Sequence, residues 1–239
     1  PLLNNNWKLV YFIYSLAPLT AAIIWLFITN KEIALNKKKF NKFSISESIS
    51  TFKMIITKKR FVNILILGAS GMFLVHGIHG WLPKIINSKG IDLTISSSLA
   101  TIPILVGIIS ALTIPRFSNN LTRIKILALL FINAALSLIL IQSFIYIIFI
   151  SGLFLLGIST GSLIVTILNH MSETKDITYN NLGISGGLFF SIIEIGGVLG
   201  PFFIGLVFDI YENFNIALSI YALIMFMMLF PIFVIRNEK

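Results

Sequence analysis

The sequence has no cysteine and very little charge. Only 11% of its 239 residues are charged, whereas 56% are hydrophobic. Soluble domains are on average about half apolar and about a quarter charged. The composition therefore excludes an ordinary soluble domain and predicts an integral membrane protein. Because cysteine is absent, the chain can form neither a disulfide framework nor a thiolate metal site.

The signatures of several functional classes are also missing. The chain has no G-x-x-x-x-G-K-[ST] string and no HExxH motif, and its apolar segments contain no paired carboxylates, although nucleotide hydrolysis, zinc catalysis and acid–base catalysis need such patterns. The net charge is +9, but the basic residues lie between apolar segments and are not interleaved with aromatic residues as in a nucleic-acid platform. We therefore expect no cofactor, no metal, no nucleic-acid partner and no enzymatic activity.

Seven apolar segments are long enough to cross a bilayer, which takes about 20 residues in a helix. They cover residues 8–29, 61–82, 95–115, 124–142, 145–168, 182–208 and 215–235. The predicted fold class is an all-α polytopic membrane protein with seven transmembrane helices, whose surroundings are the lipid bilayer.

The one long connection, residues 31–60, is strongly basic. Ser44 followed by Glu47 has the spacing of a capping box at a helix start. Apolar residues then recur near helical spacing at Ile45, Ile49, Phe52 and Ile56. This pattern predicts an amphipathic helix on the membrane surface; a solvated linker is the alternative.

The basic residues are distributed unequally between the two sides of the predicted spans. If residues 31–60 are cytoplasmic, 15 of the 18 basic residues lie on that side. By the positive-inside rule the C-terminus is then cytoplasmic and the N-terminus external. We expect a prokaryotic plasma membrane. Trp81 falls near the outer end of its span, where indole rings commonly anchor at the interface.

The first residue is Pro1, and no export signal precedes the first predicted span. An external N-terminus and an odd number of spans favour a piece of a longer protein. Processing of a complete short protein is the alternative.

A carboxylate, Glu194, lies near the middle of segment 182–208. Several small or polar residues share its helical face: Gly183, Gly187, Ser191, Gly197, Pro201 and Gly205. A charge in a span is costly and by default marks a functional site. We therefore expect Glu194 and Ser191 to contact a coupling ion or substrate in a cavity lined by Gly187 and Gly197. The alternative is a protonated acid that only fastens two helices together.

Two histidines, His76 and His79, share a face of segment 61–82 because they are three residues apart. They could bind an anion, relay protons, or pair with Glu194. The alternative is that they form hydrogen bonds to carbonyl groups or face the outer vestibule. Two imidazoles alone rarely hold zinc. Pro103 and Pro201 fall inside predicted spans, where each could act as a hinge or as an ordinary packing kink.

Asn133 lies near the centre of its span. An amide there is expected to make an interhelical hydrogen bond.

Residues 114–125, with the sequence IPRFSNNLTRIK, lie between the third and fourth predicted spans. They resemble the short cytoplasmic loop of major facilitator superfamily transporters, of the type P-x-x-S-D-R-x-G-R-[RK]-[RK]. Pro115, Arg116, Arg123 and Lys125 are the residues we assign to this motif. The sequence departs from the pattern at Asn119, Asn120 and Thr122, where the family usually has Asp, Arg and Gly.

Other segments are similar to the same superfamily. Residues 196–209, GGVLGPFFIGLVFD, resemble its eleventh helix, and residues 157–161, GISTG, fit its small-residue tenth helix. The string GWLP at 80–83 is similar to the outer end of the seventh helix in cyanate-permease-like members.

The resemblance implies helices 6–12 of a twelve-helix fold. Residues 1–30 would be the last helix of the N-terminal half, 31–60 the loop between the halves, and 61–239 the C-terminal six-helix bundle. Helices 1–5 of the N-terminal half would be the missing partner. Such transporters work by alternating access around a site near the membrane midplane.

The expected function is secondary active transport of a small polar solute, coupled to protons or another ion. The histidines favour an anion as the solute. The alternatives are a channel, a non-transporting assembly subunit and a polytopic membrane enzyme.

Overall fold

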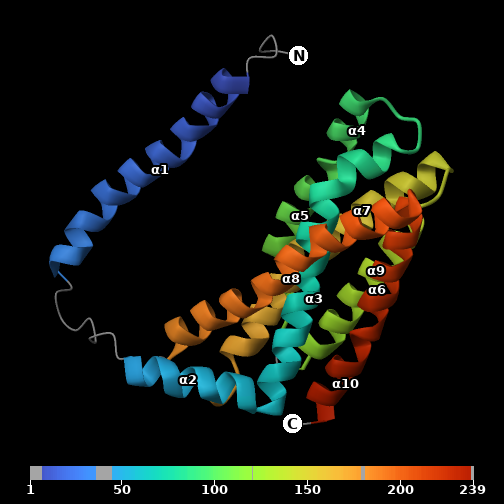
Figure 1. Ribbon diagram of the computed structural model, residues 1–239. Coiled ribbons are helices and arrows are strands. Elements are labelled where there is room, and N and C mark those ends of the chain that lie inside the picture. Colours follow the sequence, from blue (N-terminus) through green and yellow to red (C-terminus); the bar gives the residue numbers. More distant parts are fainter. Residues whose placement is uncertain (1–6, 36–44, 120, 179–180, 238–239) are drawn as a thin grey trace. The chain divides into compact units, whose positions relative to one another are not determined.

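The computed structural model describes residues 7–35, 45–119, 121–178 and 181–237 (Figure 1). Every regular element in these ranges is helical. The chain divides into two compact units, residues 1–45 and 46–239.

The first unit contains α1 (Trp7–Leu35), a 29-residue helix with Pro18 inside it. Its apolar stretch, 22 residues from Lys8 to Thr29, matches the first predicted span. At about 1.5 Å per residue it is long enough to cross the hydrocarbon core.

The second unit begins with α2 (Ile45–Thr57), which confirms a helix in the basic connection. It lies across the end of the bundle at which α3 begins (Figure 1). Thr51 and Ile55 are buried against the bundle, while the predicted apolar stripe of Ile45, Ile49, Phe52 and Ile56 is exposed. Ser44, half of the predicted capping box, lies outside the described residues. An apolar stripe left uncovered on a surface helix fits the predicted contact with lipid.

The rest of this unit is a helical bundle. Its elements are α3 (Lys59–Asn87), α4 (Leu93–Leu99), α5 (Ile102–Thr113), the 3₁₀ turn η1 (Ile114–Phe117), α6 (Arg123–Ile141), α7 (Tyr146–Ser172), α8 (Leu182–Tyr211), α9 (Phe214–Met227) and α10 (Leu229–Asn237). Together with α1, seven stretches of the described residues are long and apolar enough to cross a membrane. The predicted fold class and the seven predicted segments are confirmed.

Two of these spans are not continuous helices. The span predicted at 95–115 breaks after Leu99, four residues before Pro103, and the last span breaks after Met227, four residues before Pro231. A proline ring clashes with the carbonyl group four residues earlier and provides no backbone N–H. Pro103 lies inside the predicted span, as expected, and occupies the second position of α5, where proline is well tolerated.

Glycines bring α3 and α8 into close backbone contact. A Cβ atom on Gly196 would collide with the carbonyl oxygen of Ala69, and one on Gly200 with that of Phe73. The pair α5 and α7 is built similarly, because a Cβ on Gly161 would collide with the carbonyl of Gly107. In lipid, burial of apolar surface contributes little to the free energy of helix association, because the lipid tails are also apolar. Small residues that permit close van der Waals contact therefore decide which helices pair.

The two ends of the bundle are held by polar contacts. At one end, Lys58 forms an ion pair with Asp176. At the other end, the Lys89 ammonium donates hydrogen bonds to the carbonyl oxygens of Gln142 and Ser143 at 2.9 and 3.2 Å. Burial lowers the pKa of Lys89. At each end of the bundle, these contacts therefore link two inter-helix connections of that end.

The α3–α8 contact predicts a difference between two glycines of α8. Gly196→Ala should destabilise the protein by about 1–3 kcal/mol, because the added methyl group overpacks a backbone contact. The measurement is thermal unfolding of the purified protein in detergent.

Gly186→Ala is the matched control, because a Cβ there meets nothing within 4 Å. Both variants gain the same helix propensity, about 1 kcal/mol, so the difference between them isolates the steric effect. Equal melting temperatures would contradict the close packing of α3 on α8.

Candidate functional site

The predicted carboxylate and one predicted histidine meet beside a glycine. Glu194 is on α8 and is partly exposed, and His76 is on α3 and is exposed. Glu194 Oε2 and His76 Nδ1 lie 2.5 and 3.4 Å from one point, the position that a Cβ atom on Gly197 would occupy. Glu194 and His76 therefore border the same small space, which exists because residue 197 has no side chain.

The position of this cluster depends on the packing of α3 against α8. His76 directly precedes Gly77, whose backbone lies against Gly200, while Glu194 lies between Ile193 and Gly196 on α8. Ile193 and Gly196 pack on Gly68 and Ala69 of α3. Because the backbones touch on both sides of the cluster, the imidazole and the carboxylate are held at a fixed separation along the two helices.

The second histidine, His79, lies one turn further along α3 and is half-buried. Its Nε2 atom is buried and has no hydrogen-bond partner among the residues that the structure describes. Leaving a buried polar atom unpaired is unfavourable, so such atoms call for an explanation such as a ligand or an ordered water. This property separates His79 from the alternative of a histidine bonded to a carbonyl group.

Trp81 and Tyr221, which were not predicted as site residues, hold the helices around the site together. The Trp81 indole N–H donates a hydrogen bond of 3.0 Å to the carbonyl of Pro201, and the Tyr221 hydroxyl donates one of 2.7 Å to the carbonyl of Gly200. Trp81 thus fastens α3 to α8, in addition to the interfacial position that we expected. Tyr221, which is fully buried on α9, could have been suspected as a polar aromatic residue inside an apolar span.

The residues predicted near the beginning of this face of α8, Gly183, Gly187 and Ser191, are in open surroundings, whereas Pro201 and Gly205 lie against Trp81. Ser191 is exposed, and its hydroxyl donates to the carbonyl of Gly187 in its own helix at 2.9 Å. A Cβ on Gly183 or Gly187 would meet nothing within 4 Å. The closest contact of α8 with α3 is made instead by Gly196 and Gly200. The face of α8 that packs on α3 therefore lies next to the face predicted from the sequence.

Pro103 lies apart from these residues of α3 and α8. It is buried at the start of α5, with its backbone next to Gly157 of α7. Pro201 is inside α8, as predicted.

The predicted cytoplasmic loop motif contains a buried ion pair. Arg123 is only 2% exposed and its guanidinium lies 2.6 Å from the carboxylate of Glu173 at the end of α7. It also donates to the hydroxyl and carbonyl oxygens of Ser118 at 3.2 and 3.3 Å. Glu173 was not predicted as a site residue. It is the acidic residue that directly follows α7, and this position next to the end of a span is the signal that could have identified it.

Two of the residues that depart from the family pattern, Asn119 and Thr122, build the turn themselves, while the third, Asn120, lies outside the described residues. The Asn119 side chain accepts hydrogen bonds from the backbone N–H groups of Leu121 and Thr122, at 2.9 and 3.0 Å. The Thr122 hydroxyl donates to the carbonyl of Phe117 at 2.6 Å. Such local side-chain contacts are typical of Asn and Thr in turns. Of the other motif residues, Pro115 lies in η1, and Arg116 and Lys125 have exposed side chains.

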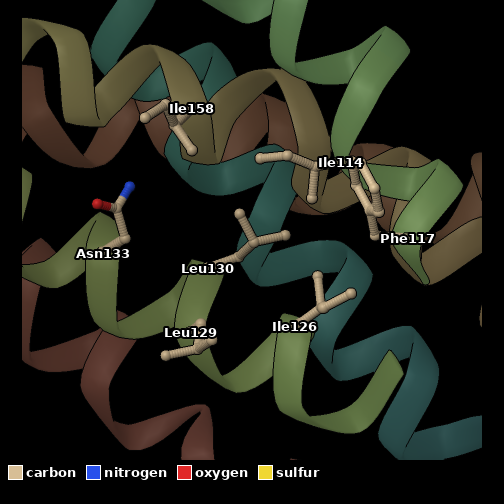
Figure 2. A pocket seen from close by; sticks show the side chains of 7 residues that line it. All are labelled: Ile114, Phe117, Ile126, Leu129, Leu130, Asn133 and Ile158. Carbon is tan, nitrogen blue, oxygen red and sulfur yellow. The ribbon is translucent and has the colours of Figure 1, made fainter. Parts of the chain in front are cut away.

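A groove of about 440 Å³ lies between η1, α6 and α7 (Figure 2). Asn133 lies at one end of it, among apolar side chains. Its amide donates to the carbonyl of Leu155 and to the hydroxyl of Ser159, both at 2.7 Å. The predicted interhelical hydrogen bond of Asn133 is confirmed, and because this amide is already bonded, the groove has little to offer a polar solute.

A family model described as the Major Facilitator Superfamily matches residues 2–176. The chain belongs to this superfamily. Among curated proteins, a search finds no match. The superfamily consists of integral membrane proteins that transport solutes, and not of enzymes. Membership therefore supports a role in membrane transport. The match does not favour the cyanate-permease-like subgroup. The matched residues of this major facilitator chain include Arg123, Glu173, His76 and His79, but end before α8, which carries Glu194.

The buried ion pair gives a stability prediction. Glu173→Gln should lower the free energy of unfolding by about 3 kcal/mol, because it leaves the buried Arg123 guanidinium without its counter-charge. Arg123→Gln should lower it by about 1–3 kcal/mol, because it removes the hydrogen bonds to Ser118 and Glu173 but leaves only a carboxylate that is 48% exposed. Both effects are measured by thermal unfolding in detergent.

Arg116→Gln is the control, because this arginine belongs to the same loop and is exposed. Its effect should stay within about 0.5 kcal/mol. If Arg123→Gln were no more destabilising than Arg116→Gln, the ion pair would not be part of the folded protein.

Proposed function

We propose that this chain takes part in secondary active transport of a small polar solute by alternating access, coupled to protons or to another ion. Glu194 and His76 are the proposed coupling and solute-binding groups. The observation that carries the proposal is the convergence of these two side chains beside Gly197, on two helices that are long and apolar enough to span a membrane.

The chemistry of these groups supports coupling. A carboxylate in a span is expensive when charged and unpaired, so its protonation state depends strongly on what lies next to it. An imidazole can gain or lose a proton near neutral pH. A solute or proton that binds beside Gly197 would therefore change the charge of the cluster.

His79 and Ser191 are proposed to extend the solute site. The unpaired, buried Nε2 of His79 offers a hydrogen-bonding position, and two histidines three residues apart on α3 favour an anionic solute. Ser191 lies on the open face of α8, one turn before Glu194. The cyanate-permease-like subgroup stays a prediction based on the GWLP string.

We also propose the domain arrangement that the family resemblance implies. The six-span part, 61–239, is the C-terminal half; residues 1–30 are the last helix of the N-terminal half, and 31–60 connect the two. Helices 1–5 would complete the transporter. The proposed location is the prokaryotic plasma membrane, with the C-terminus cytoplasmic. The ion pairs Lys58–Asp176 and Arg123–Glu173 are compatible with this orientation, because they link three connections that the charge distribution assigns to the cytoplasm.

Transport in proteoliposomes tests the proposal. The full-length protein is assayed by counterflow and by pH-driven uptake with a panel of small anions at two pH values. Glu194→Gln should reduce pH-driven uptake at least about tenfold, which corresponds to ~1.4 kcal/mol, because the amide cannot exchange a proton. His76→Gln should weaken solute binding and shift the pH dependence of uptake.

Glu212→Gln is the matched control, because Glu212 is an exposed carboxylate at the end of the same helix. It should transport like the wild type. Wild-type pH-driven uptake by Glu194→Gln would refute the coupling role. Absence of counterflow by the folded wild-type protein with every solute tested would favour an assembly subunit instead.

A further inference from the structure

A second groove, of about 560 Å³, lies between α6 and α10. Its walls include Ala128 and Ile132 of α6 and Leu229 and Phe233 of α10, and Lys125 stands at one end. Its volume is in the range of roughly 300 to 1,000 Å³ that ligand pockets occupy.

The groove results from the break in the last span. α9 packs chiefly on α6, whereas α10, beyond Met228, packs more on α3 than on α6. The break lies four residues before Pro231, whose ring disfavours continuation of α9. The chain therefore turns away from α6 over the last third of the span and leaves apolar side chains of both helices uncovered.

Lys125 gives this groove a charged end. It lies in the first turn of α6, so its ammonium can reach the headgroup level while its stem follows the apolar wall. Among the described residues no carboxylate forms an ion pair with it, and the nearby Arg123 is already paired with Glu173. Lys125 is thus a cation available to a ligand.

Two other grooves of the described bundle have no charged residue in their lining. One is the groove around Asn133, and the other lies between α6 and α9 and includes Ile139 and Ser219. The combination of a hydrocarbon-like wall and a headgroup-level cation distinguishes the α6–α10 groove from both.

We propose that the α6–α10 groove is a binding site for an anionic phospholipid of the surrounding membrane. An acyl chain lies along Ala128, Ile132 and Phe233, and the headgroup phosphate accepts a hydrogen bond from Lys125. The apolar wall fits hydrocarbon, the lysine fits an anion, and one lipid molecule carries both. Basic pockets between transmembrane helices are recognised sites of anionic headgroups. A soluble anion would leave the apolar wall uncovered.

The 239 residues contain no cysteine, so a single reporter cysteine can be placed in the groove after any cysteine elsewhere in the full-length protein has been replaced. Ile132→Cys, labelled with bimane, places a fluorophore in the groove of the full-length protein. Quenching is then measured in vesicles with brominated phosphatidylglycerol or brominated phosphatidylcholine. The site should prefer the anionic lipid by about fivefold, the effect expected of one lysine near the membrane surface.

Variants of the lysine identify the cause of that preference. Lys125→Met should abolish it and Lys125→Arg should keep it, while Lys175→Met, which changes an exposed lysine of another connection, should leave it unchanged. The reporter Ile139→Cys, in the uncharged α6–α9 groove, should show no preference. Equal melting temperatures of the lysine variants exclude misfolding as the cause.

Three results would overturn the proposal. The first is equal quenching by both lipids at Ile132→Cys, which indicates bulk lipid. The second is an anionic preference that survives Lys125→Met in folded protein. The third is protection of the label from both lipids together with disulfide-linked dimers of unlabelled Ile132→Cys, which would place a second copy of the chain in the groove.

Discussion

The close backbone contact between α3 and α8 is the constraint on which the rest of the site depends. Gly196 and Gly200 allow two carbonyl groups of α3 to approach α8 more closely than any side chain would permit. Tyr221 then hydrogen-bonds to the carbonyl of Gly200 and brings α9 against the same pair. Loss of this contact would separate His76 from Glu194 and would remove the partners of Trp81 and Tyr221. Helix pairing in lipid relies on such packing because apolar surface alone does not distinguish one neighbour from another.

The few charged groups inside the apolar bundle differ in their interaction partners. Arg123 is buried but paired with Glu173 and bonded to Ser118, which is the arrangement expected of a structural charge. Glu194 has no ion pair among the described residues and lies beside an open corner shared with His76. The Arg123–Glu173 pair is needed for the fold because loss of either partner removes interactions of a buried charge, whereas a charge without such partners is a candidate for binding a proton or a solute.

Proline shapes the bundle by ending helices as well as by bending them. α4 and α9 both end four residues before a proline, and α10 then takes a course closer to α3. Pro201 has a different effect, because it stays inside α8 and its carbonyl accepts a hydrogen bond from Trp81. The same residue type therefore produces a groove in one place and a fixed inter-helix contact in another, depending on the partners nearby.

The sequence by itself determined that this is a helical membrane protein, the approximate limits of all seven spans, the helix in the basic connection, and the residue types worth suspecting. It did so because span length and hydropathy are local properties that the bilayer dictates. Only the tertiary structure decided that Gly196 and Gly200 make the close contact while Gly183 and Gly187 stay open. It also paired Arg123 with Glu173 and brought His76 and Glu194 to one corner. These pairings join residues 50 or more positions apart, and helical periodicity gives the face of each residue but not the neighbour that the face meets.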